Sequence, residues 1–295
     1  MPNTTREDQM SSVFDDRPCQ LGEGPLWHPS RGQLFWFDIV GRKLMTRDDQ
    51  GPKEWAFDEM MSAAGWIDAD RLLVASETAL WVMDLESGAT DRVTALEADN
   101  PLTRSNDGRA DPWGGFWIGT MGKKAENGQG SIWRYYRGEL RRLYPGISIT
   151  NAICFSPDRR FGYFADTARQ TVWRVALNPL HGWPKGEPEV FLDLTASGRD
   201  PDGAVIDADG TLWLAEWGSS RVAAYGADGQ FIRAVPIGGR HTSCPAFGGA
   251  EMKTLFVTTA RIDLSQDVLT AEPLNGCTFA ADAGATGLPE YQVIL

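Results

Sequence analysis

A short apolar run recurs six times along this chain, and its regular return restricts the possible folds more than any other feature. The runs are QLFWFD (33–38), RLLVAS (71–76), GFWIGT (115–120), FGYFAD (161–166), TLWLAE (211–216) and TLFVTT (254–259). Trp36 and Leu73 hold equivalent positions in the first two runs and are 37 residues apart, and the later spacings are longer, up to 50 residues. A period of this size is typical of propellers and other repeat architectures.

A turn precedes each run, and further apolar stretches lie before that turn and after the run. The turns include HPSRG, DPWGG and DADG, and the later stretches include ALWVMDL and TVWRVAL. Each repeat therefore predicts strand, turn, strand, loop and strand, with room for a fourth strand. Six such units predict an all-β, six-bladed β-propeller with four-stranded antiparallel blades. The alternative, a β-sandwich, does not explain a regular repeat.

The chain is expected to form one domain, because no Pro- or Ser-rich linker divides it. We predict a single propeller over residues 11–295, preceded by a flexible N-terminal tail over residues 1–10. A propeller ring is commonly closed by strands from both chain ends within one blade. We therefore expect SSVFDDR (11–17) to pair with YQVIL (291–295), the two segments nearest the ends of the propeller.

The charge of the chain limits its partners. With 40 acidic and 28 basic residues, the net charge is −12 and the pI is about 4.8. Such a surface repels nucleic acid and anionic membranes, which need clustered Lys and Arg. No run of 18 apolar residues suggests a membrane span, and the polar N-terminus lacks the apolar segment of a signal peptide. We expect a cytoplasmic monomer or small homo-oligomer with a small-molecule ligand; the four cysteines, which form no CxxC motif, also fit a reducing compartment.

One position of the repeat carries polar residues in most blades. Counting back six residues from the equivalent turn position reaches Glu23, Ala63, Asn106, Asn151, Asp202 and Ser243. In a propeller, residues of equal phase gather around the mouth of the central channel, so the two carboxylates and two amides should converge there. An all-oxygen group of this kind suits Ca²⁺, Mg²⁺ or Mn²⁺, and a first-row transition metal could also bind.

A single Asn or Asp before a strand is commonly a turn residue, and Asn-Asp-Gly at 106–108 has the composition of an ordinary turn. The shared phase favours a functional interpretation instead. Carboxylates that converge without a cation would repel each other and would be costly to bury.

Several motifs together resemble the SMP-30/gluconolactonase/LRE family, which includes regucalcin and sugar lactonases. They are LGEGP (21–25), RSNDGRADPWGGFWIGTM (104–121), TNAICFSPD (150–158), PDGAVIDADGTLWLAEW (201–217) and PAFGG followed by LFVTTA (245–260). The resemblance runs from about residue 17 to the end of the chain. It implies a six-bladed propeller that binds one divalent cation and hydrolyses aldonolactones.

The resemblance also implies roles for individual residues. By motif, Glu23, Asn151 and Asp202 are the metal ligands, and Arg104 and Asn106 contact the substrate. Asp202 also matches the general base. Ca²⁺ is the first candidate for the cation, and Zn²⁺, Mn²⁺, Mg²⁺ and Fe²⁺ are the alternatives.

The segment GTMGKKAENGQG (119–130) departs from the family pattern. Regucalcin-like members carry acidic residues facing the sugar after GTM, whereas this chain has Lys123 and Lys124. We include Lys124 among the substrate-binding candidates, although a lysine in such a loop is commonly only solvated. Two aromatic residues are further candidates: Trp217 as a sugar platform or as blade packing, and His241 near the sixth channel strand.

These residues predict metal-assisted hydrolysis of a cyclic ester. A cation would polarise the lactone carbonyl, and Asp202 would accept a proton from the attacking water. A polar, acidic pocket suits a neutral polyol lactone better than a phosphorylated one. Two alternatives stay open: a non-enzymatic calcium- or sugar-binding propeller that keeps the same ligands, and a metal-dependent aryl esterase. No GxSxG motif supports a serine hydrolase.

Overall fold

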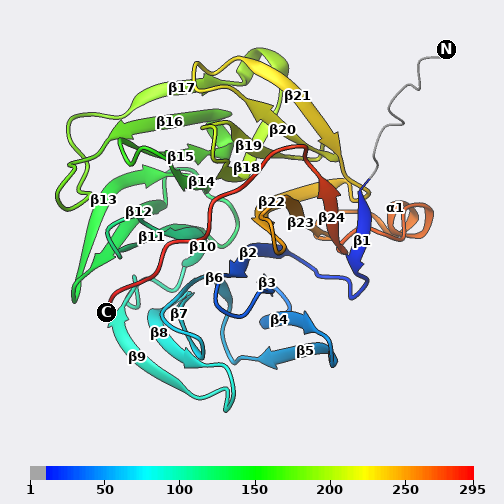
Figure 1. Ribbon diagram of the computed structural model, residues 1–295, viewed down its shortest axis with the longest axis horizontal. Coiled ribbons are helices and arrows are strands. Elements are labelled where there is room, and N and C mark those ends of the chain that lie inside the picture. The colour runs from blue at the N-terminus through cyan, green and yellow to red at the C-terminus, as the bar shows by residue number, and fades with distance from the viewer. Residues whose placement is uncertain (1–10) are drawn as a thin grey trace.

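The computed structural model describes residues 11–295, and its strands form six separate four-stranded sheets. The sheets are arranged as a ring around a common centre (Figure 1). Every pairing within a sheet is antiparallel. The prediction of a six-bladed β-propeller with four-stranded antiparallel blades is therefore confirmed. The predicted tail, residues 1–10, lies outside the described residues.

The blades follow the order of the sequence. Blade 1 contains β2 (Gly22–His28), β3 (Gln33–Asp38), β4 (Lys43–Asp48) and β5 (Gly51–Ala56). Blade 2 contains β6 (Met61–Trp66), β7 (Arg71–Ser76), β8 (Ala79–Asp84) and β9 (Thr90–Ala95). Blade 3 contains β10 (Thr103–Ala110), β11 (Phe116–Gly122), β12 (Gly130–Tyr136) and β13 (Glu139–Ile147).

The second half of the ring repeats this order. Blade 4 contains β14 (Thr150–Phe155), β15 (Phe161–Asp166), β16 (Thr171–Ala176) and β17 (Glu189–Asp193). Blade 5 contains β18 (Asp200–Ile206), β19 (Leu212–Trp217), β20 (Arg221–Tyr225) and β21 (Phe231–Pro236). Blade 6 contains β22 (His241–Gly248), β23 (Thr254–Ala260), β24 (Thr278–Asp282) and β1 (Ser12–Asp15).

Helical structure is confined to three short segments in the described part of the chain. They are η1 (Thr167–Arg169), η2 (Thr195–Ser197) and α1 (Gln266–Ala271). The helix α1 lies between β23 and β24, and the hydroxyl of Ser265 accepts a hydrogen bond from the backbone of Val268 at its start. None of the helices in residues 11–295 has the length and apolarity needed to cross a membrane.

The recurring apolar runs form the second strand of each blade. Their equivalent positions, Trp36, Leu73, Trp117, Tyr163, Trp213 and Phe256, are all buried. The large aromatic side chains fill the wedges between neighbouring blades. Trp117 of blade 3 packs edge-on against Phe155 of blade 4, with ring centroids 5.4 Å apart. The repeat visible in the sequence is therefore a repeat of inter-blade packing.

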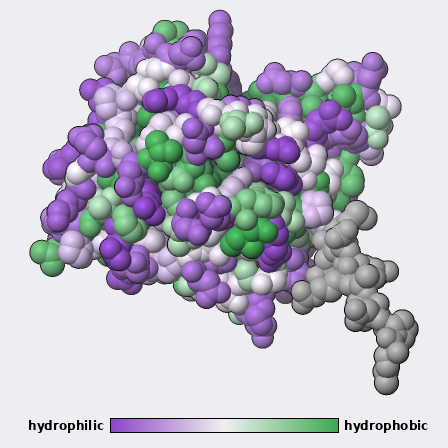
Figure 2. All heavy atoms as spheres, turned by 90° about the horizontal axis from the view of Figure 1, so that it is seen from above, coloured by the Kyte–Doolittle hydropathy of each residue, from purple (hydrophilic) through white to green (hydrophobic). Residues whose placement is uncertain are grey.

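The outer strands face solvent. Most residues of β5, β9, β13, β17 and β21 are exposed or only partly buried. In the view of Figure 2, hydrophilic residues cover most of the visible surface and apolar patches are small and scattered. The first strands, in contrast, are almost entirely buried, and each contacts the first strands of its two neighbours around the centre of the ring.

Blade 6 contains strands from both ends of the chain, but the expected pairing was wrong in its partner. The strand β1 pairs with β24, and Ser12 lies opposite Ala280. Residues 291–295 form no strand. The C-terminal segment instead runs across the middle of the ring (Figure 1). The hairpin β23–β24 already presents an unpaired edge to β1, which leaves the last residues available for other contacts.

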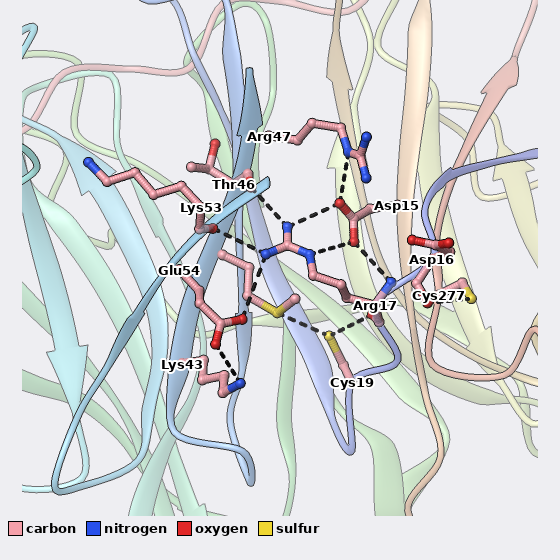
Figure 3. A network of polar contacts seen from close by, with 11 residues as sticks. Asp15, Asp16, Arg17, Cys19, Lys43, Thr46, Arg47, Lys53, Glu54 and Cys277 are labelled. Carbon is pink, nitrogen blue, oxygen red and sulfur yellow. Dashed lines mark hydrogen bonds and ion pairs between the residues drawn. The ribbon is translucent and has the colours of Figure 1, made fainter. Parts of the chain in front are cut away.

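A buried carboxylate ties β1 to the neighbouring blade (Figure 3). Asp15 accepts hydrogen bonds from Nε of Arg17 and from Nε of Arg47 on β4, both at 2.9 Å. Arg17 also donates from Nη2 to the backbone carbonyl of Thr46, at 2.9 Å. Burial of the Asp15 carboxyl opposes its ionisation, but the two arginines more than compensate and hold its pKa below the ordinary value. This cluster fastens the outermost strand of blade 6 to blade 1.

Candidate active site and metal centre

Each first strand contains a break in register near its beginning. In β2 the break follows Glu23, in β10 it follows Ser105, in β14 it follows Asn151, and in β18 it follows Pro201. The two remaining first strands, β6 and β22, have the same irregularity. An extra residue at such a bulge breaks the strict alternation of side chains and can redirect one of them. The polar residues of the repeat lie at or directly beside these bulges, within the first strands and not before them.

The backbone at two of these bulges is unusual. Gly24 and Ala152, which follow Glu23 and Asn151, have φ angles of 53° and 55°. A side chain at Gly24 would also overlap the backbone oxygen of Ser62 in the adjacent blade. The left-handed conformation is unfavourable for an alanine, at a cost of roughly 1–2 kcal/mol. Such local strain is found most often where side chains are held for function.

A cavity of about 520 Å³ opens at this end of the channel. All six residues singled out from the sequence line it: Glu23, Arg104, Asn106, Lys124, Asn151 and Asp202. They come from blades 1, 3, 4 and 5 and are up to 179 residues apart, from Glu23 to Asp202. The remaining two positions of the same phase, Ala63 and Ser243, are fully buried. Ser243 donates a hydrogen bond to the backbone carbonyl of Gly22 at 2.5 Å, so its role there is to join blade 6 to blade 1.

A chain of hydrogen bonds connects polar side chains of blades 3 and 4 to the backbone of blade 5. Nη1 of Arg104 donates to Oδ1 of Asn106 at 2.7 Å. Nδ2 of Asn106 donates to Oδ1 of Asn151 at 3.1 Å. Nδ2 of Asn151 donates to Oγ1 of Thr167 at 2.8 Å, and that hydroxyl donates to the backbone carbonyl of Pro201 at 2.6 Å. The chain ends beside Asp202 and fixes the orientation of both amides.

Glu23 and Asp202 are buried carboxyl groups that influence each other's ionisation. Burial, and next the charge of Asp107, raises the pKa of Glu23 to about 8. Burial, and next the charge of Glu23, raises the pKa of Asp202 well above its ordinary value. Neither carboxyl group forms an ion pair with any basic side chain of residues 11–295. Two neighbouring carboxylates would therefore be stabilised by an added cation.

The donor atoms at this point are all oxygens. No group of three or more His, Cys, Asp or Glu side chains that could hold a metal occurs within residues 11–295. Two carboxylates, from Glu23 and Asp202, and the Oδ1 atom of Asn151 are the atoms that could bind a cation here. Oδ1 accepts one hydrogen bond from Asn106, and a carbonyl oxygen of this kind has a second lone pair. This donor set fits a hard divalent cation.

The basic residues of the cavity differ in their surroundings. Arg104 is buried, and burial lowers its pKa to about 10 despite the opposing charges of Glu23 and Asp202. Lys123 forms an ion pair with Glu77. Lys124 is exposed and forms no ion pair within residues 11–295, and Glu126 accepts a hydrogen bond from its backbone nitrogen at 3.0 Å. The cavity wall contributed by blade 3 is thus the basic one.

The cavity is also lined by Trp217 of blade 5, one of the residues considered from the sequence. Trp217 stacks on His241, with ring centroids 4.2 Å apart and planes 20° from parallel. His241 does not line the cavity itself; its Nδ1 lies 3.0 Å from the backbone carbonyl of Ile262. His241 therefore supports the wall from behind.

Sequence reasoning missed three charged residues in the channel below the cavity. Asp107 is buried, and Oδ2 accepts a hydrogen bond from the backbone of Ile153 at 2.6 Å. Arg109 is buried on the same strand and pairs with Glu290 from the C-terminal segment. The motif SNDGR places Asp107 and Arg109 within three residues of Asn106, which is the signal that could have found them. Glu290 had no such signal, because it follows the last strand by eight residues.

The chain is similar over most of its length to a family of known proteins. The family described as the SMP-30/Gluconolactonase/LRE-like region matches residues 21–261. The L-arabinolactonase of Azospirillum brasilense is 36% identical over 286 residues, which cover 94% of this chain and 93% of that protein. The 6-deoxy-6-sulfogluconolactonase of Pseudomonas putida is 30% identical over 278 residues, which cover 93% and 95%.

A solved structure has nearly the same fold. It is the crystal structure of a calcium-binding protein, regucalcin, from Agrobacterium tumefaciens str. C58. The two chains are 40% identical, the TM-score is 0.94, and the match covers 97% of this chain and 98% of the other. The similarity therefore extends over all six blades.

Proposed function

This chain belongs to the SMP-30/gluconolactonase/LRE-like family, and from that membership we propose that it is a sugar lactonase. It hydrolyses the cyclic ester of a sugar (aldono)lactone to the open-chain aldonic acid, and it uses one divalent cation. The observation that carries the proposal is the pair of buried carboxyl groups, Glu23 and Asp202, which share one cavity with two amides and form no ion pair within residues 11–295.

Glu23, Asn151 and Asp202 are the proposed ligands of the cation. When bound, the cation supplies polarisation of the lactone carbonyl and stabilisation of the negative charge that develops on its oxygen. Ca²⁺ is the first candidate, because the ligand atoms are all oxygens and a 40% identical structural relative is described as a calcium-binding protein. Zn²⁺, Mn²⁺, Mg²⁺ and Fe²⁺ are the alternatives.

Asp202 is the proposed general base. Its position in the cavity allows it to accept a proton from the water that attacks the carbonyl carbon, and to return that proton to the ring oxygen that leaves. One carboxylate oxygen would serve as a ligand and the other would face the water.

Arg104, Asn106 and Lys124 are the proposed substrate contacts. Arg104 and Asn106 are buried and held by hydrogen bonds, so Arg104 presents its remaining N–H groups, and Asn106 the second lone pair of Oδ1, in fixed directions to the oxygens and hydroxyl groups of the sugar. Lys124 lies on the same wall, where an exposed ammonium group can reach a polar or charged substituent. The relatives named above act on different sugar lactones, so these side chains are where we expect specificity to reside.

The cytoplasm is the proposed location. All four cysteines, Cys19, Cys154, Cys244 and Cys277, are free and buried, which suits a reducing compartment. The proposed partner is a small sugar lactone, and the charge of −12 disfavours nucleic acid and anionic membranes. A monomer or small homo-oligomer is expected.

The test is a hydrolysis screen with a pH indicator, in which several aldonolactones are offered with each cation in turn. We expect acid release that depends on a divalent cation and stops when a chelator removes it. The Asp202→Asn variant is the matched control, since it keeps the shape of the side chain and removes its basic group. Acid release by the parent that is equal with and without cation would contradict the proposal.

A second candidate is a propeller that binds calcium without turnover, which the match to the calcium-binding regucalcin favours. It predicts calorimetric binding of Ca²⁺ that is lost in Glu23→Gln, together with no acid release from any lactone. The aryl esterase alternative predicts turnover of phenyl esters and none of aldonolactones. The same screen with an aryl ester added separates all three.

A further inference from the structure

The C-terminal segment closes the end of the channel opposite the cavity. We call residues 283–295 the C-terminal strap. The backbone nitrogen of Ala208 donates to the carbonyl of Thr286 at 2.9 Å, just beyond the end of β18. Further along, the backbone nitrogen of Val293 donates to the carbonyl of Trp66 at 2.8 Å, at the end of β6. The strap therefore crosses the ring from blade 5 to blade 2 (Figure 1).

One strap residue reaches into the channel. Glu290 accepts a hydrogen bond from Nη1 of Arg109, and both side chains are buried. Its backbone carbonyl also accepts a hydrogen bond from Nε1 of Trp66 at 2.8 Å, which fixes the strap at this residue. Burial opposes the charge on Arg109, but Glu290 raises the pKa of Arg109 above its ordinary value. The guanidinium is thus held charged inside the channel by a residue of the strap.

Arg109 connects the strands that carry the proposed site. It belongs to β10, the strand of Asn106. Its Nε donates to the backbone carbonyl of Ile153 on β14, and its Nη2 donates to that of Ala204 on β18, both at 3.2 Å. These carbonyls lie two residues after Asn151 and Asp202. One guanidinium therefore spans three neighbouring first strands directly below their bulges.

We propose that Glu290 and Arg109 form a positioning pair that sets the spacing of β10, β14 and β18 and thereby places Asn151 and Asp202 as cation ligands. The inference rests on the proposed function, because it requires a cation at that site. The reason is geometric: ligand atoms must be held within about 0.5 Å, and residues behind them provide that precision. No side chain of the pair touches substrate or cation in this scheme.

The first experiment compares Glu290→Gln with Gln292→Ala. Gln292 also anchors the strap, by donating from Nε2 to the backbone carbonyl of Ile67 at 2.6 Å, but it forms no hydrogen bond with Arg109. Calorimetric titration with Ca²⁺ should show affinity lower by about 10–100-fold in Glu290→Gln, the usual cost of losing an outer partner of a metal ligand. Gln292→Ala should bind Ca²⁺ as the parent does, even if its melting temperature falls.

A double variant controls for the possibility that Glu290→Gln does not fold. Glu290→Gln leaves a buried arginine without its counter-ion, which could destabilise the whole ring. The double variant Arg109→Met with Glu290→Leu removes both charges, together with the two hydrogen bonds to β14 and β18. It should fold, as judged by its melting temperature without cation, and still bind Ca²⁺ more weakly than the parent. Rescue by Glu290→Asp, which keeps the negative charge, should restore part of the affinity.

Two results would overturn the inference: parent-like Ca²⁺ affinity in both Glu290→Gln and the folded double variant, or an equal loss in Gln292→Ala. Measurements on the parent protein distinguish failure of this inference from failure of the proposed function. If the parent binds cation and hydrolyses a lactone while the variants keep their affinity, only the positioning role is wrong. If the parent binds no divalent cation, both proposals are wrong.

Discussion

The Nδ2 atom of Asn106 lies 3.1 Å from Oδ1 of Asn151 and donates a hydrogen bond to it. This bond joins a residue proposed to contact substrate to a residue proposed to bind the cation. The two functions therefore share one hydrogen-bond network. A substitution that alters substrate contact should also affect cation binding, and the reverse. Cation affinity and lactone hydrolysis therefore need separate measurements in variants of this network.

Glu23→Gln should weaken cation binding, because it removes a negatively charged ligand from a buried site. The loss should be at least the roughly 10–100-fold typical of an outer-shell change. The melting temperature with saturating Ca²⁺ should fall as well, since a ligand that binds the native state stabilises it. Isothermal titration and thermal melts measure both effects. Glu251→Gln, an exposed residue paired with Lys253, is the control. Equal cation affinity in Glu23→Gln and parent would remove Glu23 from the site.

Asp202→Asn should lower lactone hydrolysis by roughly 10²–10⁴-fold, the usual contribution of general-base catalysis. A further decrease is expected if the cation is lost too, so turnover is measured at saturating cation. Asp209→Asn, on the exposed turn after the same strand, is the matched control. A variant at position 202 that binds cation and hydrolyses lactone at the parent rate would refute the assigned role.

Arg104→Ala should raise KM more than it changes cation affinity. A lost hydrogen bond to a neutral polar group costs about 0.5–1.5 kcal/mol, which corresponds to a change of about 2–10-fold. Arg104→Lys keeps the charge but not the planar set of donors, and it should recover only part of the loss. Steady-state kinetics beside calorimetric titration separates the two effects. A collapse of cation affinity with unchanged KM would instead assign Arg104 to the structure of the metal site.

Asp15→Asn should destabilise the protein at neutral pH and make its free energy of unfolding less dependent on pH in the acid range. The folded pKa of Asp15 is below its ordinary value of 3.8, because Arg17 and Arg47 outweigh the effect of burial. Its contribution is therefore complete above pH 3.8 and is lost as the pH falls through the folded pKa.

Urea unfolding should show a loss of about 2 kcal/mol at pH 7 for Asp15→Asn, in the range of hydrogen bonds to charged groups. The difference from the parent should shrink below pH 3.8. Asp48→Asn, at the exposed end of β4, is the control. A difference that stays constant with pH would contradict the role of the Asp15 charge.

The fold could be predicted because its packing repeats. Trp36, Trp117 and Trp213 mark the same buried place in three blades, so the period of the wedge residues is also the period of the fold. The equal position of Glu23 and Asp202 within their repeats then predicted that they lie close together, although nothing local in the sequence links them. Both predictions depend only on the order of repeats around a ring.

The parts that could not be predicted depend on contacts outside the repeat. The bulges at Asn106 and Asp202 shift the register by one residue. Such a shift within a strand needs no turn residue, so the sequence contains no signal for it. Glu290 meets Arg109 across 181 residues of sequence through a segment without regular structure. The expected strand at 291–295 was wrong for the same reason: an apolar sequence favours a strand, but here the backbone of Val293 and Ile294 donates to the carbonyls of Trp66 and Gly114 instead.

The make-up of blade 6 has a consequence for the synthesis of this protein in the cell. Its outermost strand, β1, is synthesised before blades 1 to 5, and its partner, Thr278–Asp282, is synthesised after them. Ser12 and Ala280 are separated by 268 residues, so β1 cannot pair until the five blades between them have been synthesised. Long-range pairing of this kind slows folding and leaves strand edges exposed meanwhile. The nascent chain should therefore depend on chaperone protection until its last blade has emerged.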